Sequence, residues 1–289
     1  MTWFSPVAAG LSGHAKLAAE TPRQIANAHT VFNVSNTLIF VWFSALLARF
    51  VQRLVPDRPL AQAQAIRAKY LDAELLSTPS LALDRARLEL LHMGERVREM
   101  MARILPGVFS GTRETLSEIG RMDDAVDVLH AHIISYLGQI SQTRLSENQT
   151  AELFRLMEAA NGLENIGDIV ETNLVRLGRT RLDGQFRVSP GTEQVIVDFH
   201  RTVSEAVELA LMAVSQKNEE AARRVRRMKE EINRLAESAA LHEAERLVAE
   251  EPNRLQAYTM EMDVLENLKR IYYLAKRMAR TTETAGGLK

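Results

Sequence analysis

The sequence predicts an all-α protein in which one transmembrane helix precedes two tandem three-helix bundles. Three observations predict this fold: few aromatic, Gly and Pro residues, apolar residues spaced by three and four, and one uncharged apolar run near the start. The 289 residues include 14 Gly, 8 Pro and 6% aromatics, a composition typical of long helices rather than of turn-rich sheets. With 46% hydrophobic and 25% charged residues, the chain has enough apolar surface to bury a core.

Charge and cysteine content exclude several classes of protein. The formal net charge of -1 provides no basic surface of the kind that binds DNA or RNA, so we expect no nucleic-acid partner. Cys is absent, which excludes disulfides, zinc fingers, thiolate nucleophiles and thiolate-bound iron–sulfur clusters. Any metal must therefore be bound by carboxylates or histidine.

The apolar run near the N-terminus is long enough to cross a bilayer. Residues 24–48 contain no Asp, Glu, Lys or Arg, and we place the span at about residues 28–50. Basic residues follow the run, and the positive-inside rule therefore predicts that the rest of the chain is cytoplasmic. These basic residues are Arg49, Arg53, Arg58, Arg67 and Lys69.

One side of the predicted span is polar. At 100° per residue, five polar side chains fall within an arc of about 100°. They are His29, Asn33, Asn36, Thr37 and Ser44. Such side chains either hydrogen-bond to neighbouring helices or border a polar substrate path through the membrane. Both interpretations require other membrane helices as partners.

Six helical patterns follow Pro56. The first begins at Thr78 and is expected to end near Leu105, because Pro106 and a Gly follow. The second and third carry apolar residues at steps of three and four, which indicates one buried face on each helix. Ser146, with a Gln three residues later, predicts a capping box at the start of the third helix.

The six patterns form two similar sets of three. Residues 121–129 share Arg, Met and a final Leu with residues 227–235, at an offset of 106 residues. Residues 162–170 share Leu-Glu-Asn with residues 264–272, at an offset of 102 residues. Similar offsets at two places predict an internal duplication. The second set is expected near residues 190–216, 219–248 and 252–281.

Two pairs of acids in the first set are candidate metal ligands. Asp123 and Asp127 lie one turn apart on the second helix, as do Glu164 and Asp168 on the third, and both pairs border the apolar face. Facing carboxylates repel each other unless a cation intervenes, and iron, manganese or magnesium suits oxygen ligands. Alternatively, these are solvated acids paired with arginines such as Arg121, Arg155 or Arg176.

The second set has lost most of these acids. The equivalent positions are occupied by Lys229, Asn233, Glu266 and Arg270. Only one of the four is still acidic, so we expect the second set not to bind a metal in the same way.

Familiar catalytic patterns are incomplete, and we expect no enzyme. Glu89 and His92 form a single Glu-x-x-His motif, whereas a di-iron bundle needs two. His242 begins a pattern like that of zinc peptidases, but Arg246 stands where the second His is required. There is no Gly-rich phosphate loop and no nucleophile elbow. A carboxylate-bridged metal enzyme is therefore the least favoured class.

Most of the chain resembles one known family. Residues 22–59 resemble the end of the membrane domain of bacterial sodium/phosphate cotransporters, whose last spanning helix opens with Ala-His-x-x-Phe-Asn. Here the motif is Ala28, His29, Phe32 and Asn33. The stretch from about Leu71 to Thr281 resembles the PhoU-like cytoplasmic domain fused behind that transporter, with Met93 in the first helix and LENIGD at 163–168.

The resemblance implies a division of the chain and a ligand set. Residues 1–58 would be the C-terminal end of the membrane domain, 59–77 a linker, 78–183 the first PhoU-like repeat and 184–283 the second. The first repeat would bind a multinuclear iron cluster, or manganese or zinc in its place, through the family's acidic motif. The residues that match this motif are Asp123, Asp127, Glu164 and Asp168.

The resemblance also implies a function. The family's substrate-binding repeats lie upstream of this sequence, so we expect a membrane-tethered regulatory portion of a sodium-dependent phosphate symporter in the cell inner membrane. Its expected partners are other helices of the transporter, the membrane and a second copy in a homo-oligomer. The alternative is a helical scaffold or signalling adaptor at the membrane with no direct role in transport.

Overall fold

The computed structural model describes residues 26–40, 43, 67–185, 187–247 and 253–283. The chain divides into two compact units, Met1–Leu60 and Ala61–Lys289. In the first unit, residues 26–40 are helical, and large apolar side chains along this helix are 55% to 66% exposed. They are Val31, Phe32, Val34, Leu38, Ile39 and Phe40.

The predicted membrane span is only partly covered by these residues. Within the described part of the chain, no helix is both long and apolar enough to cross a bilayer. Residues 41–42 and 44–50 of the expected span lie outside the described residues, so the span stays a prediction. Of the polar stripe, His29, Asn33, Asn36 and Thr37 are exposed on the helix, whereas Ser44 lies outside the described residues. The Thr37 hydroxyl donates to the Asn33 carbonyl at 2.8 Å.

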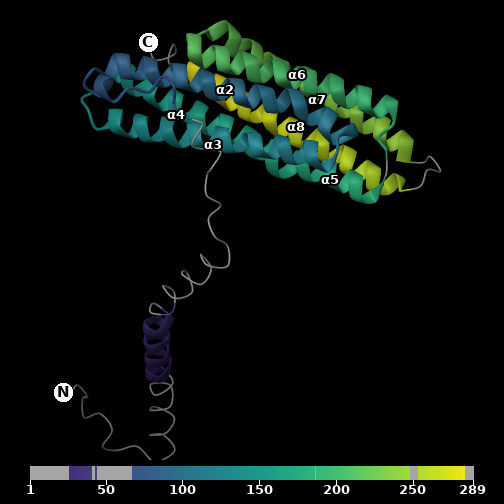
Figure 1. Cartoon of the computed structure of the whole chain (residues 1–289), viewed down its shortest axis with the longest axis horizontal. Helices are drawn as coiled ribbons and strands as arrows, with labels where there is room; N and C mark the ends of the chain where they lie inside the picture. The colour runs from purple at the N-terminus through teal and green to yellow at the C-terminus, as the bar shows by residue number, and fades with distance from the viewer. Residues whose placement is uncertain (1–25, 41–42, 44–66, 186, 248–252, 284–289) are drawn as a thin grey trace, which may run out of the picture. The chain divides into compact units, whose positions relative to one another are not determined.

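Long, closely packed helices build the second unit (Figure 1). The first half consists of α2 (Pro79–Ser110), α3 (Arg113–Ser141), α4 (Glu147–Asp168), the π-helix η3 (Ile169–Leu174) and α5 (Val175–Gly184). The second half consists of α6 (Pro190–Gln216), α7 (Glu219–Leu247) and α8 (Arg254–Glu283). Helices α2 and α4 of the first half pack against α6 and α8 of the second, so one continuous apolar core runs through both halves.

Helix α2 is longer than the sequence predicts. It continues through Pro106 to Ser110, so the expected end near Leu105 is wrong. Proline cannot donate the helical hydrogen bond to the carbonyl four residues earlier, yet the helix continues for one more turn. The Arg181 guanidinium of α5 donates to the carbonyls of Val108 and Gly111 at 2.7 and 2.6 Å. Tertiary contacts therefore hold the last turn of α2 in place.

Helix α4 begins as expected but leads into an irregular segment. The Ser146 hydroxyl accepts from the Gln149 backbone and the Gln149 side chain accepts from the Ser146 backbone, which confirms the predicted capping box. The helical path then continues through η3 into α5 without a loop. Within η3, Asn173 donates to the Asn267 side chain of α8 at 2.8 Å, which links the two halves. Single π-helical turns are often found at functional sites.

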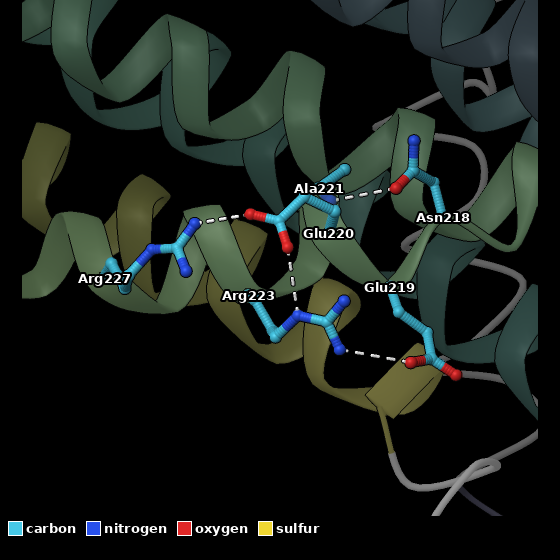
Figure 2. Close-up of polar contacts among 6 residues, drawn as sticks. All are labelled: Asn218, Glu219, Glu220, Ala221, Arg223 and Arg227. Carbon is cyan, nitrogen blue, oxygen red and sulfur yellow. Dashed lines mark hydrogen bonds and ion pairs between the residues drawn. The ribbon is translucent and has the colours of Figure 1, made fainter.

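The start of α7 is held by side chains of its own first turns (Figure 2). The Asn218 side chain accepts from the Ala221 backbone N–H at 3.0 Å and so caps the helix. Arg223 pairs with Glu219 and Glu220 at 3.2 and 3.1 Å, and Glu220 also pairs with Arg227 at 2.6 Å. Both acids therefore already form ion pairs with arginines on the surface of α7.

The Glu-x-x-His motif of α2 has a structural role. Glu89 is fully buried, and its Oε2 accepts from the backbone N–H groups of Lys69 and Tyr70 at 2.7 and 2.6 Å. Its other oxygen lies 2.9 Å from Nδ1 of His92. The Tyr136 hydroxyl donates to the Asp72 carbonyl at 2.6 Å. This motif therefore anchors the segment that enters the bundle.

Candidate metal centre

Three of the four predicted ligands converge between α3 and α4. Carboxylate oxygens of Asp123, Asp127 and Asp168 all lie within 4.8 Å of one another. Asp123 is only 3% exposed, whereas Asp127 and Asp168 reach the surface. Glu164 is one turn before Asp168 on α4, and its carboxylate is not part of this close group. We call Asp123, Asp127 and Asp168 the acidic seam.

A glycine allows the two helices to approach at the acidic seam. Gly167 of α4 faces Asp123, and a Cβ at this position would collide with the Asp123 Oδ1 atom and lie 3.3 Å from Val126 Cγ1. Only glycine leaves room for a carboxylate at this depth. The sequence around Gly167 is therefore suited to bringing an acid from α3 against the backbone of α4.

The charges of the acidic seam destabilise one another. Burial, followed by the charges of Asp127 and other acids, raises the pKa of Asp123 to about 8. Burial and then Asp168 raise the pKa of Asp127, against a lowering effect of His130. The pKa of Glu164 is raised by burial and then by Asp168. Crowded carboxylates that resist ionisation are typical of sites that hold a cation or a proton.

The residues of the acidic seam fit a cation. The Oδ1 atom of Asp123 is buried and has no hydrogen-bond partner among the described residues. A buried carboxylate oxygen without a donor is costly, and a bound cation would remove that cost. The arginines that could instead have neutralised these acids, Arg121, Arg155 and Arg176, make no ion pair with them in the described part of the chain. Asp123, Asp127 and Asp168 would hold the ion, with Glu164 close by.

Two further polar groups near the acidic seam were missed in the sequence. Glu171 of η3 raises the pKa of Asp123, and its Cγ lies 3.7 Å from where a Cβ at Gly120 would stand. His130 lies within hydrogen-bonding distance of Asn161, with 2.9 Å between Nε2 and Oδ1. The signal was present as spacing, because Glu171 and His130 each follow a seam aspartate by three residues.

The equivalent positions of the second half lie on α7 and α8. Lys229, Glu266 and Arg270 are exposed and Asn233 is half-buried. Arg270 and Asp168, which are equivalent by the sequence offset, line the same pocket of about 490 Å³ between α4, η3 and α8. The Arg270 guanidinium donates to the Asn267 side chain at 3.4 Å. The second half thus presents a cation where the first presents a carboxylate.

Known proteins share this architecture and sequence. The crystal structure of PhoU from Pseudomonas aeruginosa superposes with a TM-score of 0.63 at 18% identity, covering 69% of this chain and 94% of that one. This likeness shows the fold. Proteins named "Putative inorganic phosphate export protein YjbB" from Salmonella typhimurium strain LT2 and Escherichia coli strain K12 are 26% and 25% identical over 244 residues. The match covers 84% of this chain and 44% of each relative, so the chain spans less than half their length.

A family model assigns the chain directly. The model described as "PhoU domain" matches residues 90–173 and 196–282, which together make up more than half of the chain. The two matched ranges include the acidic seam in the first half and its basic counterpart in the second. The chain therefore belongs to the PhoU domain family.

Proposed function

We propose that this chain is the membrane-tethered regulatory portion of a sodium-dependent phosphate transport system. The observation that carries the proposal is the extent of its similarity to the phosphate export proteins. The matched 244 residues are more than the unit Ala61–Lys289 contains, so the similarity includes part of the N-terminal segment as well as the bundle. A PhoU-family bundle joined to such a segment is suited to reporting on transport rather than to catalysis.

The N-terminal helix supports the tether. Its apolar side chains, among them Phe32, Ile39 and Phe40, are more than 60% exposed. Large apolar side chains exposed along a helix normally face lipid or another protein. We propose that they face both, with the polar side chains His29, Asn33 and Asn36 turned toward other transporter helices. We propose, accordingly, that the bundle lies at the inner membrane, on its cytoplasmic side.

The acidic seam supports a regulatory metal. We propose that Asp123, Asp127 and Asp168, assisted by Glu164, bind iron, or manganese or zinc in its place. The bound ion would supply the positive charge that the crowded carboxylates lack. Its binding would link α3 to the end of α4, where the π-helix η3 begins. Occupancy could then be passed to the second half through the Asn173–Asn267 hydrogen bond.

Phosphate flux in cells tests this function. We expect deletion of the gene to change the uptake or release of radiolabelled phosphate, and re-expression of the full chain with its native partners to restore it. The double variant Asp127→Asn with Asp168→Asn should not restore normal flux, whereas Glu266→Gln, at the exposed equivalent position, should. Replacing sodium with potassium should remove the flux that depends on the gene.

The alternative is an adaptor without a role in transport. Unchanged phosphate flux in the deletion strain, together with capture of a kinase or another signalling partner by the bundle, would contradict the proposed function and favour the adaptor. A flux that changes on deletion but ignores sodium would contradict the sodium dependence alone.

A further inference from the structure

A second cluster of charged side chains lies toward the start of α4, away from the acidic seam. A pocket of about 930 Å³ opens there between α4, the end of α6, the start of α7 and the end of α8. Its lining includes four cations, Arg155, Lys217, Arg277 and Arg280, and four acids, Glu147, Glu152, Glu158 and Glu219. We call this the basic pocket.

Arg155 is the unusual member of the basic pocket. It is half-buried, and its side chain makes no hydrogen bond or ion pair with any described residue. Burial and the neighbouring Arg87 lower its pKa, so nothing nearby compensates for its charge. The pKa of Lys217 is also lowered by burial, Arg87 and Arg155, which places these three cations close together.

Three acids of the basic pocket are already paired with cations other than Arg155. Glu152 is shared between Arg87 and Lys217, the latter at 2.7 Å. Glu158 pairs with Arg277 at 2.5 Å. Glu219 pairs with Arg223 on the surface of α7 (Figure 2). Each of these acids already has a cation, so none is available to neutralise Arg155.

The remaining acid of the lining is too far away. Glu147 stands eight residues before Arg155 on the same helix, which at 1.5 Å per residue separates their backbones by about 12 Å. A half-buried guanidinium is thus left facing a water-accessible pocket.

Two buried polar atoms next to the basic pocket also lack partners. Thr282 lines the pocket and is only 4% exposed, and its hydroxyl has no hydrogen-bond partner among the described residues. The Nε atom of Arg87, whose guanidinium also pairs with Glu152, is likewise buried and has no hydrogen-bond partner among the described residues. Native proteins rarely leave such groups unsatisfied without water or a ligand. Arg155 and Thr282 both line the basic pocket.

We propose that the basic pocket binds a phosphate group, with Arg155 as its main contact and Lys217 and the Thr282 hydroxyl as supporting contacts. The planar guanidinium matches the geometry of phosphate oxygens and forms two parallel hydrogen bonds with them. The choice of phosphate among oxyanions rests on the proposed function, whereas the anion site itself rests on the geometry. The ligand would bridge the two halves of the bundle, because α4 belongs to the first and α6 and α8 to the second.

Calorimetric titration of the purified full-length chain in detergent tests this site. Inorganic phosphate at up to millimolar concentrations should bind to the wild type. Arg155→Gln should weaken binding by about tenfold to a hundredfold, the value of one or two hydrogen bonds to a charged group. Lys217→Gln should weaken it less. Lys217 has a positive φ of 53°, and glutamine tolerates this conformation in the same chain at Gln185, so this variant should keep the fold if Arg155→Gln does not.

Matched controls give each outcome a meaning. Arg113→Gln removes an exposed arginine that pairs with Asp183 and should leave phosphate affinity unchanged. The double variant Asp127→Asn with Asp168→Asn should also bind phosphate normally. A failure of the basic pocket to bind phosphate would therefore leave the proposed function standing, and a failure of the proposed function would leave the basic pocket standing as an anion site. Glycerol 3-phosphate in place of inorganic phosphate distinguishes an esterified headgroup from the free ion. The proposal would be overturned if the wild type bound neither compound, or if the wild type and Arg155→Gln bound phosphate equally well.

Discussion

The two helix pairs α3–α4 and α7–α8 occupy corresponding places in the two halves but differ in charge at the positions of the acidic seam. At the first, Asp123, Asp127 and Asp168 converge within 4.8 Å. At the second, Lys229 and Arg270 take two of these positions, and Lys276 of α8 has its pKa lowered by burial and by Lys229 and other cations. Similar helices can thus support different chemistry, because the apolar faces set the packing and a few positions at the seam set the charge.

Helix packing also differs between the acidic seam and the equivalent positions of the second half. Gly167 allows the buried carboxylate of Asp123 to lie against α4, whereas its equivalent in the second half is Lys269. A long side chain at this position is incompatible with a buried acid opposite, and the corresponding Lys229 is indeed exposed. The acidic seam therefore needs both its carboxylates and the glycine that makes room for them.

The largest effect on stability is expected from the pH dependence of Asp123. Its pKa is about 8 in the folded protein and near 4 when unfolded, so the folded state holds a proton that the unfolded state has lost. The free energy of unfolding should therefore fall as pH rises from about 4 to 8. Asp123→Asn removes this term, so in denaturant titrations without metal its stability advantage over the wild type should grow over that range. A difference that is constant with pH would show that Asp123 ionises freely.

The next effect concerns the room that Gly167 provides. Gly167→Ala should destabilise the protein by about 1–3 kcal/mol, as is usual for overpacking a tight contact, and should weaken metal binding. Gly138→Ala is the matched control, because Gly138 lies within α3 and a Cβ there meets nothing within 4 Å. This control should instead gain about 0.5–1 kcal/mol from helix propensity. Equal effects of the two variants on chemical denaturation would contradict a close approach at the acidic seam.

A smaller effect is expected in the second half, where a substitution should stabilise the protein rather than destabilise it as Gly167→Ala does. Burial, and then Lys229 and neighbouring arginines, lower the pKa of Lys276 in the folded protein, so its charge costs stability at neutral pH and that cost disappears only as pH rises toward 10. Lys276→Gln should therefore stabilise the protein slightly, by about the few tenths of a kcal/mol typical of like-charge pairs on helices. Thermal unfolding at low salt measures this gain, which should shrink when salt is added. A loss of stability would mean that Lys276 is not under repulsion.

The smallest effect is expected at Glu266, the remaining acid of the second half. It is exposed, and two of the three other equivalent positions are cationic. Glu266→Gln should cause no measurable change in the free energy of unfolding and should leave the metal content unaltered. A loss of metal in this variant would show that the second half contributes a ligand after all.

Local patterns in the sequence predicted much of the helical architecture. The capping box at Ser146 is a short-range signal, and it is present as expected. The end of α2 could not be predicted, because the turn after Pro106 is held by Arg181, which lies more than 70 residues further along the chain. The π-helix η3 also interrupts an apolar spacing that looks regular in the sequence.

The acidic seam was only partly predictable for similar reasons. Spacing alone paired Asp123 with Asp127, but it gave no indication that Asp123 is buried while Asp127 is exposed. That difference depends on Gly167 of the facing helix. The basic pocket was not predicted at all. The sequence suggests Arg155 only as a partner of the seam acids. Lys217 and Thr282, which line the same pocket, lie at least 60 residues from Arg155 in the sequence.

Metal content measured together with thermal stability tests most directly whether the acidic seam is a metal site and its counterpart is not. The full-length wild type, loaded with iron or manganese, should retain metal and should unfold at a higher temperature than after treatment with chelator. At a free metal concentration 100 times the dissociation constant the gain is about 2.7 kcal/mol. Asp127→Asn with Asp168→Asn should lose both the metal and the gain, and Glu266→Gln should lose neither. A wild type that retains no metal, and whose melting temperature is the same with metal and with chelator, would contradict the account.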